Sequence, residues 1–253
     1  FLASCDSEEF GGPFRILIFR GTQGSSFKDI STDLKAYLQT ADEGGSVHAG
    51  FYKAYRNVAD RIRELAGASD TPLYIAGHSL GGALAMVASR DLNADYIAAT
   101  YTYGCPRVGN DAYFRGLKVP VYRIVNAGDG VARIPFGFIL SIILTGIRLI
   151  PINFTREVSE FLRRHFAGYT HWGHLIFLSA ENPRLKKGVY PLDFKLKMSP
   201  DIFWRSSIVV WRWIKTRGKS LYIDHDMQNY RRKLGDYAIY RNQLRDIKLS
   251  NLG

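Results

Sequence analysis

A serine in a glycine-flanked turn is the residue of this sequence best suited to nucleophilic chemistry. Residues 77–82 read Gly-His-Ser-Leu-Gly-Gly, after an apolar run at 73–76 and before a stretch of small residues at 83–88. A serine on a sharp strand-to-helix turn needs neighbours without a bulky Cβ two positions before and after it, and Gly77 and Gly81 meet that need. The pattern predicts a nucleophile elbow with Ser79 as the nucleophile. Because a helix begins at this turn, the Leu80 N–H is the first candidate oxyanion-hole donor.

A serine nucleophile requires a histidine base, which in turn is oriented by a carboxylate. The sequence contains six histidines. His78 adjoins Ser79, and adjacent side chains diverge on such a turn. His225 lies in a polar stretch near the chain end and is our choice for the base, with His171 and His174 as the alternatives.

The acid should lie between nucleophile and base in the order Ser, Asp, His. Asp129 lies between two glycines, shortly after the apolar run at 121–125, and meets this requirement. Asp224 and Asp226 flank His225 and are poor choices, because an adjacent side chain cannot easily reach the same ring nitrogen. Taken in isolation, Asp129 would also fit an ordinary turn residue.

The segments around these residues alternate between short apolar runs and helical patterns. Buried strands are expected at 14–19, 73–76, 97–103 and 121–125, and one amphipathic helix of about four turns is expected from Phe51 to Leu65. Alternating strands and helices predict an α/β fold with a mostly parallel central sheet covered by helices on both faces. Ligands of such sheets gather at the carboxyl ends of the strands, where Thr22, Ser79 and Asp129 fall.

Length and charge restrict the class of protein further. The 253 residues suit one α/β domain, and Cys5 and Cys105 could be bridged or remain thiols. Residues 1–135 hold 14 basic and 14 acidic residues, whereas residues 136–253 hold 20 and 9. The positive half favours an anionic partner, and lipid is favoured over nucleic acid because no nucleic-acid motif is present.

Several short motifs occur in one order along residues 14–230. Besides the elbow, they are Phe19-Arg20-Gly21-Thr22, Val47-His48-Ala49-Gly50-Phe51, Tyr103-Gly104-Cys105-Pro106-Arg107-Val108-Gly109, Asn126-x-x-Asp129-x-Val131 and His225-x-x-x-x-Tyr230. In these motifs the chain resembles the class 3, fungal-type lipases.

The resemblance implies an α/β-hydrolase fold with Ser79, Asp129 and His225 as catalytic triad. It also implies that Thr22 shares the oxyanion hole with Leu80, and that neither metal nor cofactor is needed. The expected activity is hydrolysis of acylglycerol esters, as in a triacylglycerol lipase. The alternatives are phospholipase A1 activity on anionic phospholipids and a catalytically idle membrane-binding module.

Two segments depart from the compact family pattern within what we expect to be a single domain, 1–253. The insertion at about 134–168 begins with an uncharged apolar run that is too short to span a bilayer. It favours a lid or interfacial element, with a buried core helix as the alternative. The basic segment at about 203–219 combines Trp204, Trp211 and Trp213 with Arg205, Arg212 and Lys215, which suits a membrane surface or an amphipathic helix on the core.

These features predict a lipid substrate at an oil–water or membrane interface and a peripheral membrane contact. The sequence begins at Phe1 without an initiator methionine, which indicates residues missing upstream. Secretion or peripheral membrane association is favoured, and the oligomeric state stays open.

Overall fold

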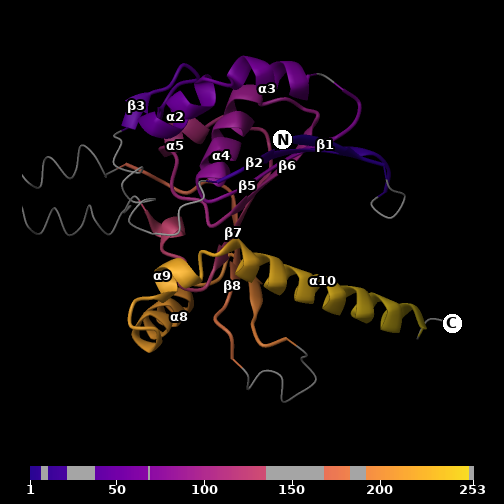
Figure 1. Ribbon diagram of the computed structural model, residues 1–253, viewed down its shortest axis with the longest axis vertical. Coiled ribbons are helices and arrows are strands. Elements are labelled where there is room, and N and C mark those ends of the chain that lie inside the picture. The colour runs from indigo at the N-terminus through magenta and orange to yellow at the C-terminus, as the bar shows by residue number, and fades with distance from the viewer. Residues whose placement is uncertain (7–10, 22–37, 68, 135–167, 183–191, 251–253) are drawn as a thin grey trace, which may run out of the picture. The chain divides into compact units, whose positions relative to one another are not determined.

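The computed structural model describes residues 1–6, 11–21, 38–67, 69–134, 168–182 and 192–250 (Figure 1). The chain divides into two compact units, one of residues 1–123 and 131–174 and the other of residues 124–130 and 175–253. Two predicted features lie outside the described residues: Thr22 and the apolar insertion from residue 135 onward.

The first unit is built on a mostly parallel sheet. Its strands are β1 (Leu2–Cys5), β2 (Phe14–Phe19), β5 (Leu73–His78) and β6 (Ile97–Tyr103), hydrogen-bonded in that order. β1 is antiparallel to β2, whereas β2, β5 and β6 run parallel to one another. The predicted α/β class with a mostly parallel sheet is confirmed.

Helix α4 (Leu80–Leu92) covers one face of this sheet and packs against β2, β5 and β6 (Figure 1). In β5 the side chains of Leu73 and Ile75 are buried, while the alternate positions are half-buried. The alanines of α4 are mostly buried, because their small side chains let the helix lie close to the sheet. The rings of Tyr101 and Tyr122 stack with their centres 5.2 Å apart, and the ring of Tyr74 lies tilted against that of Tyr101 at 6.4 Å.

The single helix expected from Phe51 to Leu65 is wrong: the segment forms two helices, α2 (Ala49–Arg56) and α3 (Ala59–Ala66). His48 Nδ1 accepts the Phe51 N–H at 3.3 Å and caps α2. Val58 leaves the helical region at φ −126° and ψ 2°, and its side chain is exposed. Ala59, Ile62 and Ala66 of the second helix are buried, so α3 also packs against the core.

Shorter elements complete the first unit. They are the hairpin of β3 (Leu38–Thr40) and β4 (Ser46–His48), helix α5 (Asp111–Phe114) and a 3₁₀ turn, Val131–Arg133. Neither Cys5 nor Cys105 forms a disulfide in the part of the chain that the structure describes. β7 (Val121–Asn126) leads from the first unit into the second.

The second unit contains a β-hairpin and three helices. β8 (His174–Leu178) pairs antiparallel with β9 (Leu196–Met198), and α8 (Ile202–Lys215), α9 (Ser220–Ile223) and α10 (Met227–Ser250) follow. Figure 1 shows α9 beside α8 and α10 running straight toward the C-terminus. α8 is the predicted amphipathic helix, capped by Asp201, and none of its residues is buried. Among the described residues, no helix is both long and apolar enough to cross a bilayer.

Candidate active site

Ser79 lies between β5 and α4 in a backbone conformation that few non-glycine residues adopt. Its dihedral angles are φ 57° and ψ −127°. The Ser79 N–H donates to Tyr103 O at 2.9 Å, and Ser79 O accepts from the N–H groups of Gly82 and Ala83 in the first turn of α4. Such strain persists only where surrounding contacts enforce it, and it is frequent at functional sites. The turn therefore has the geometry of the predicted nucleophile elbow.

The glycines around Ser79 are required by contact distances. A Cβ on Gly77 would lie 2.1 Å from Gly81 O, and a Cβ on Gly81 would lie 2.2 Å from Phe19 O. A Cβ on Gly21 would lie 2.6 Å from His78 O, so the end of β2 also packs directly on the elbow. These approaches confirm the steric reason for the Gly-x-Ser-x-Gly spacing.

Leu80 is the first residue of α4. The N–H groups of a helix's first turn have no partner within the helix and carry the positive end of its dipole. Backbone donors are thus available beside Ser79, in the position expected for Leu80. Thr22 is the next residue after the described Gly21 and falls outside the described residues.

Asp129 and His225 meet in the second unit, although they are far apart in sequence. His225 Nδ1 lies 3.0 Å from Asp129 Oδ2 and 3.1 Å from Asp129 Oδ1, and both side chains are buried. An ionised carboxylate can only accept hydrogen bonds, so the ring donates from Nδ1. A neutral imidazole in this tautomer carries its lone pair on Nε2, which is the atom that a general base needs.

The loop that carries Asp129 is held by backbone hydrogen bonds. The Asp129 N–H donates to Asn126 O at 2.8 Å, and the Gly130 N–H donates to Leu221 O at 3.0 Å. The Tyr230 hydroxyl donates to Asp129 Oδ2 from the first turns of α10. Burial raises the pKa of Tyr230 well above its ordinary value, so this phenol stays a donor.

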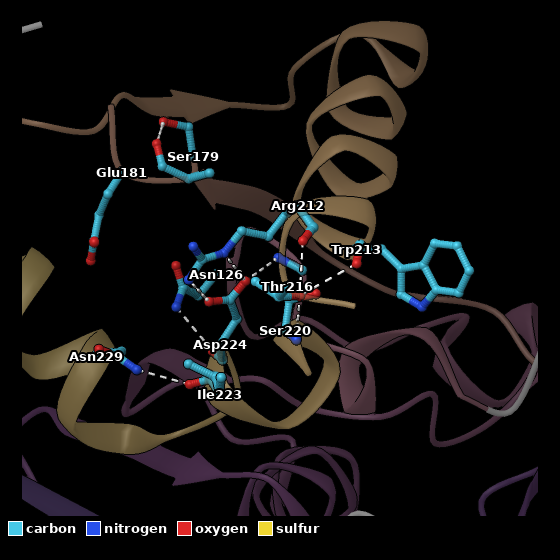
Figure 2. Close-up of polar contacts among 12 residues, drawn as sticks. Asn126, Ser179, Glu181, Arg212, Trp213, Thr216, Ser220, Ile223, Asp224 and Asn229 are labelled. Carbon is cyan, nitrogen blue, oxygen red and sulfur yellow. Dashed lines mark hydrogen bonds and ion pairs between the residues drawn. The ribbon is translucent and has the colours of Figure 1, made fainter. Parts of the chain in front are cut away.

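The Asp224 carboxylate is bound by a backbone N–H and by a guanidinium. Its Oδ2 accepts the Gly128 N–H at 2.9 Å, and its two oxygens accept from Arg212 at 2.7 and 3.1 Å (Figure 2). Arg212, from the basic, tryptophan-rich segment, is thus paired with a carboxylate of the second unit. No local sequence pattern signals a pair between α8 and the residue before His225.

A buried cation, Lys233, supports the same loop. Lys233 Nζ donates to Asn126 Oδ1 at 2.7 Å and to Ser179 O at 2.8 Å. Burial lowers the pKa of Lys233 to about 8. Sequence reasoning missed this residue, although Lys233 follows Tyr230 by one helical turn and so lies on the same face of α10.

The other histidines considered have contacts elsewhere in the first unit. His171 Nε2 lies 2.8 Å from Ala132 O, and His174 is the exposed first residue of β8. Within the described residues, no group of three or more His, Cys, Asp or Glu side chains is arranged to hold a metal ion. The structure thus brings Asp129 and His225 together in the second unit and places Ser79 and Leu80 in the first.

Comparison with known proteins finds a matching protein family. Residues 16–138 match the family model described as lipase (class 3). A secreted mono- and diacylglycerol lipase 1 of Fusarium solani is 39% identical over 107 residues, which cover 38% of this chain and 32% of that protein. A lipase of Rhizopus niveus is 34% identical over 142 residues, or 49% of this chain and 36% of that protein.

The chain thus spans about a third of the length of these curated relatives. Among solved structures, a lipase from Rhizopus microsporus var. chinensis is similar, with 26% identity, a TM-score of 0.47 and coverage of 78% of this chain and 61% of that one. The family match spans the segment from β2 through the elbow to the Asp129 loop. In this segment the chain is similar to the class 3 lipases.

Proposed function

We propose that this protein hydrolyses carboxylic esters of lipids with Ser79 as nucleophile, His225 as base and Asp129 as the acid that orients it. Ser79 Oγ attacks the ester carbonyl while His225 Nε2 takes its proton and passes it to the leaving alcohol. Water, activated by the same nitrogen, then releases the fatty acid from the acyl-enzyme. The N–H groups of Leu80 and Thr22 hold the oxyanion.

The observation that carries this proposal is the buried Asp129–His225 pair, in which the carboxylate accepts a hydrogen bond from Nδ1. A structural histidine needs no such pairing, whereas a general base does, because the carboxylate both selects the tautomer and stabilises the imidazolium. The strained backbone of Ser79 supports the assignment independently, because a non-glycine residue at φ 57° is disfavoured without a compensating role.

Acylglycerols are the substrate class that we favour, because the relatives are described as a lipase and as a mono- and diacylglycerol lipase. The "secreted" in the latter name supports an extracellular or surface-associated location. We place triacylglycerol hydrolysis first.

Helix α8 supports contact with a lipid surface. Its apolar side chains are strongly exposed, with Phe203 at 81%, Ile214 at 64% and Trp213 at 52%. Aromatic and aliphatic side chains on a helix with basic neighbours suit the boundary between headgroups and acyl chains. The net positive charge of residues 136–253 would attract anionic lipid to this side.

Phospholipase A1 activity is the second candidate, and a cleft beside α8 favours it. The cleft has a volume of about 930 Å³ and lies between α8 and residues 179–182. Lys197 Nζ lies 4.3 Å from the ring centre of Trp204, and Lys215 Nζ lies 4.8 Å from that of Trp211. Ammonium groups over indole rings offer an anionic headgroup a cation beside an apolar wall.

Covalent labelling tests the proposal directly. An alkyl organophosphonate should label the wild-type chain once and inhibit turnover of a soluble short-chain ester, and Ser79→Ala should neither be labelled nor turn over ester. Ser89→Ala, a change of another buried serine on α4, is the matched control and should keep both properties. Labelling that persists in Ser79→Ala would refute the nucleophile, and a wild-type chain that is never labelled would favour the idle module.

Parallel assays then separate the two substrate classes. Triacylglycerol emulsions and vesicles of anionic phospholipid are compared at equal protein concentration, with release of fatty acid as the readout. A higher rate on emulsions supports the acylglycerol lipase, and a higher rate on vesicles supports the phospholipase.

A further inference from the structure

An ion pair connects α8 to the chain segment that precedes His225. Arg212 Nη2 lies 2.7 Å from Asp224 Oδ1, and Arg212 Nε lies 3.1 Å from Asp224 Oδ2 (Figure 2). The Asp224 side chain is 3% exposed and that of Arg212 is 17% exposed. Two parallel N–H to oxygen bonds fix both the distance and the angle between guanidinium and carboxylate.

The same carboxylate also holds the segment that carries Asp129. The Gly128 N–H donates to Asp224 Oδ2, and Asn126 Nδ2 donates to the Asp224 main-chain oxygen at 2.9 Å. A Cβ on Gly128 would lie 2.9 Å from Asp224 Oδ2, so backbone and carboxylate are in close contact. Asp224 therefore contacts the residue before Asp129 and is itself the residue before His225.

Charge explains why this arrangement needs Arg212. A buried carboxylate without a cation is unfavourable, and it either takes up a proton or turns toward water. Arg212 supplies both the charge and two donors, and the hydrogen bonds to Asp224 raise the pKa of the guanidinium. If Asp224 turned away, the Gly128 N–H would lose its acceptor, and the two segments would lose their shared contact.

We propose that Arg212 is a positioning residue: through Asp224 it aligns Asp129 with His225, and it fastens the lipid-facing helix α8 to these two catalytic segments. This inference rests on the proposed function, in which Asp129 and His225 are the acid and base of an ester hydrolase. Arg212 itself touches no reacting atom. It acts only through the geometry of the Asp129–His225 pair.

The kinetic test uses Arg212→Met, Arg212→Lys and the matched control Arg232→Met in the full chain. Arg232 also pairs with a carboxylate of the second unit, Glu181, but both side chains are about 40% exposed. With a soluble short-chain ester, Arg212→Met should lower the plateau kcat roughly tenfold or more and change KM less than about twofold, because misplaced catalytic groups slow the chemical step. Arg212→Lys should fall between, since an ammonium restores the charge but not the bidentate geometry.

The pH profile separates positioning from a mere charge effect. Loss of the Arg212 charge alone would shift the midpoint of kcat against pH and leave the plateau intact. Misalignment lowers the plateau itself. A folded Arg212→Met protein whose plateau kcat stays within about twofold of wild type would overturn the proposal, whatever its midpoint.

A spectroscopic readout keeps this test distinct from the test of the function. The His225 Nδ1 proton shared with Asp129 should give a downfield proton resonance in the wild type and in Arg232→Met, and this resonance should be lost in Arg212→Met. If the wild type hydrolyses no ester, the proposed function fails, and the resonance alone decides on the positioning role. If Arg212→Met does not fold, Arg212→Lys is judged by the same two readouts.

Discussion

Tyr230 donates its phenolic hydrogen to the same Asp129 oxygen that lies 3.0 Å from His225 Nδ1. The hydroxyl oxygen in turn accepts the Asn126 N–H at 3.0 Å. The Asp129 carboxylate is therefore oriented by a neighbour that is itself fixed to the strand end preceding the loop. These contacts fix the orientation of the Asp129 carboxylate toward the His225 imidazole.

Removal of that hydroxyl should affect both activity and stability. We expect Tyr230→Phe to lower kcat on a soluble ester several-fold and to lower the free energy of unfolding by about 1–3 kcal/mol, because the buried Asn126 N–H loses its acceptor. Urea unfolding and steady-state kinetics measure the two effects. Tyr237→Phe, a change on the same helix, should alter neither by a comparable amount. Unchanged kcat in Tyr230→Phe would show that Asp129 is oriented without the phenol.

Lys233 should make stability depend on pH in the alkaline range. Its pKa is lowered by burial from 10.5 to about 8, so the folded state disfavours the charged form. The free-energy cost of burying the charged ammonium is fully present below pH 8 and disappears as the pH rises to 10.5. The free energy of unfolding of the wild type, relative to Lys233→Met, should therefore rise over this range by up to roughly 3 kcal/mol. Urea unfolding of both proteins at several pH values measures the difference, and a difference that stays constant would contradict the lowered pKa.

The elbow should not tolerate a methyl group beside the serine. Gly77→Ala places a Cβ 2.1 Å from Gly81 O, where both partners are backbone and cannot move independently. We expect loss of folded protein or a drop in melting temperature of many degrees. Gly235→Ala is the matched control, because a Cβ there meets nothing within 4 Å in the middle of α10. That change should stabilise the protein by about 0.5–1 kcal/mol. Wild-type stability of Gly77→Ala would mean that the turn is looser than its contacts indicate.

Exposed apolar residues of α8 should matter at a lipid surface and not in solution. Phe203→Ser with Trp213→Ser should weaken binding to anionic vesicles at least tenfold, since each large apolar side chain contributes about 1.5–3 kcal/mol when it leaves water. Activity on a soluble ester should stay within about twofold. Ile239→Ser removes an exposed apolar side chain from α10 instead and should leave vesicle binding unchanged. Co-sedimentation measures vesicle binding, and a soluble-ester assay measures activity. Equal losses in the two assays would show that α8 does not contact the lipid surface.

The predictions made from sequence succeeded where the physical cause is local. Strands β2 and β6 were expected at their observed bounds, because short and largely apolar runs of this length suit buried strands. The break between α2 and α3 was missed, since the apolar spacing continues through Val58 and only packing against the core decides where the second helix points. The partner of Arg212 could not be predicted, because a cation beside tryptophans suits a membrane surface as well as a helix on the core until the folded structure supplies the carboxylate.

The sequence by itself determined the elbow. Strand, glycines, serine and helix lie within a few residues, and the clash of a Cβ with nearby backbone is set by that short segment and the strand beside it. It also pointed to Asp129 and His225, through motif order. Only the tertiary structure decided that these two side chains meet, 96 residues apart, and that Asp224 binds Arg212 and Gly128. Contacts of that kind depend on which distant segments the fold brings together, and no local preference encodes them.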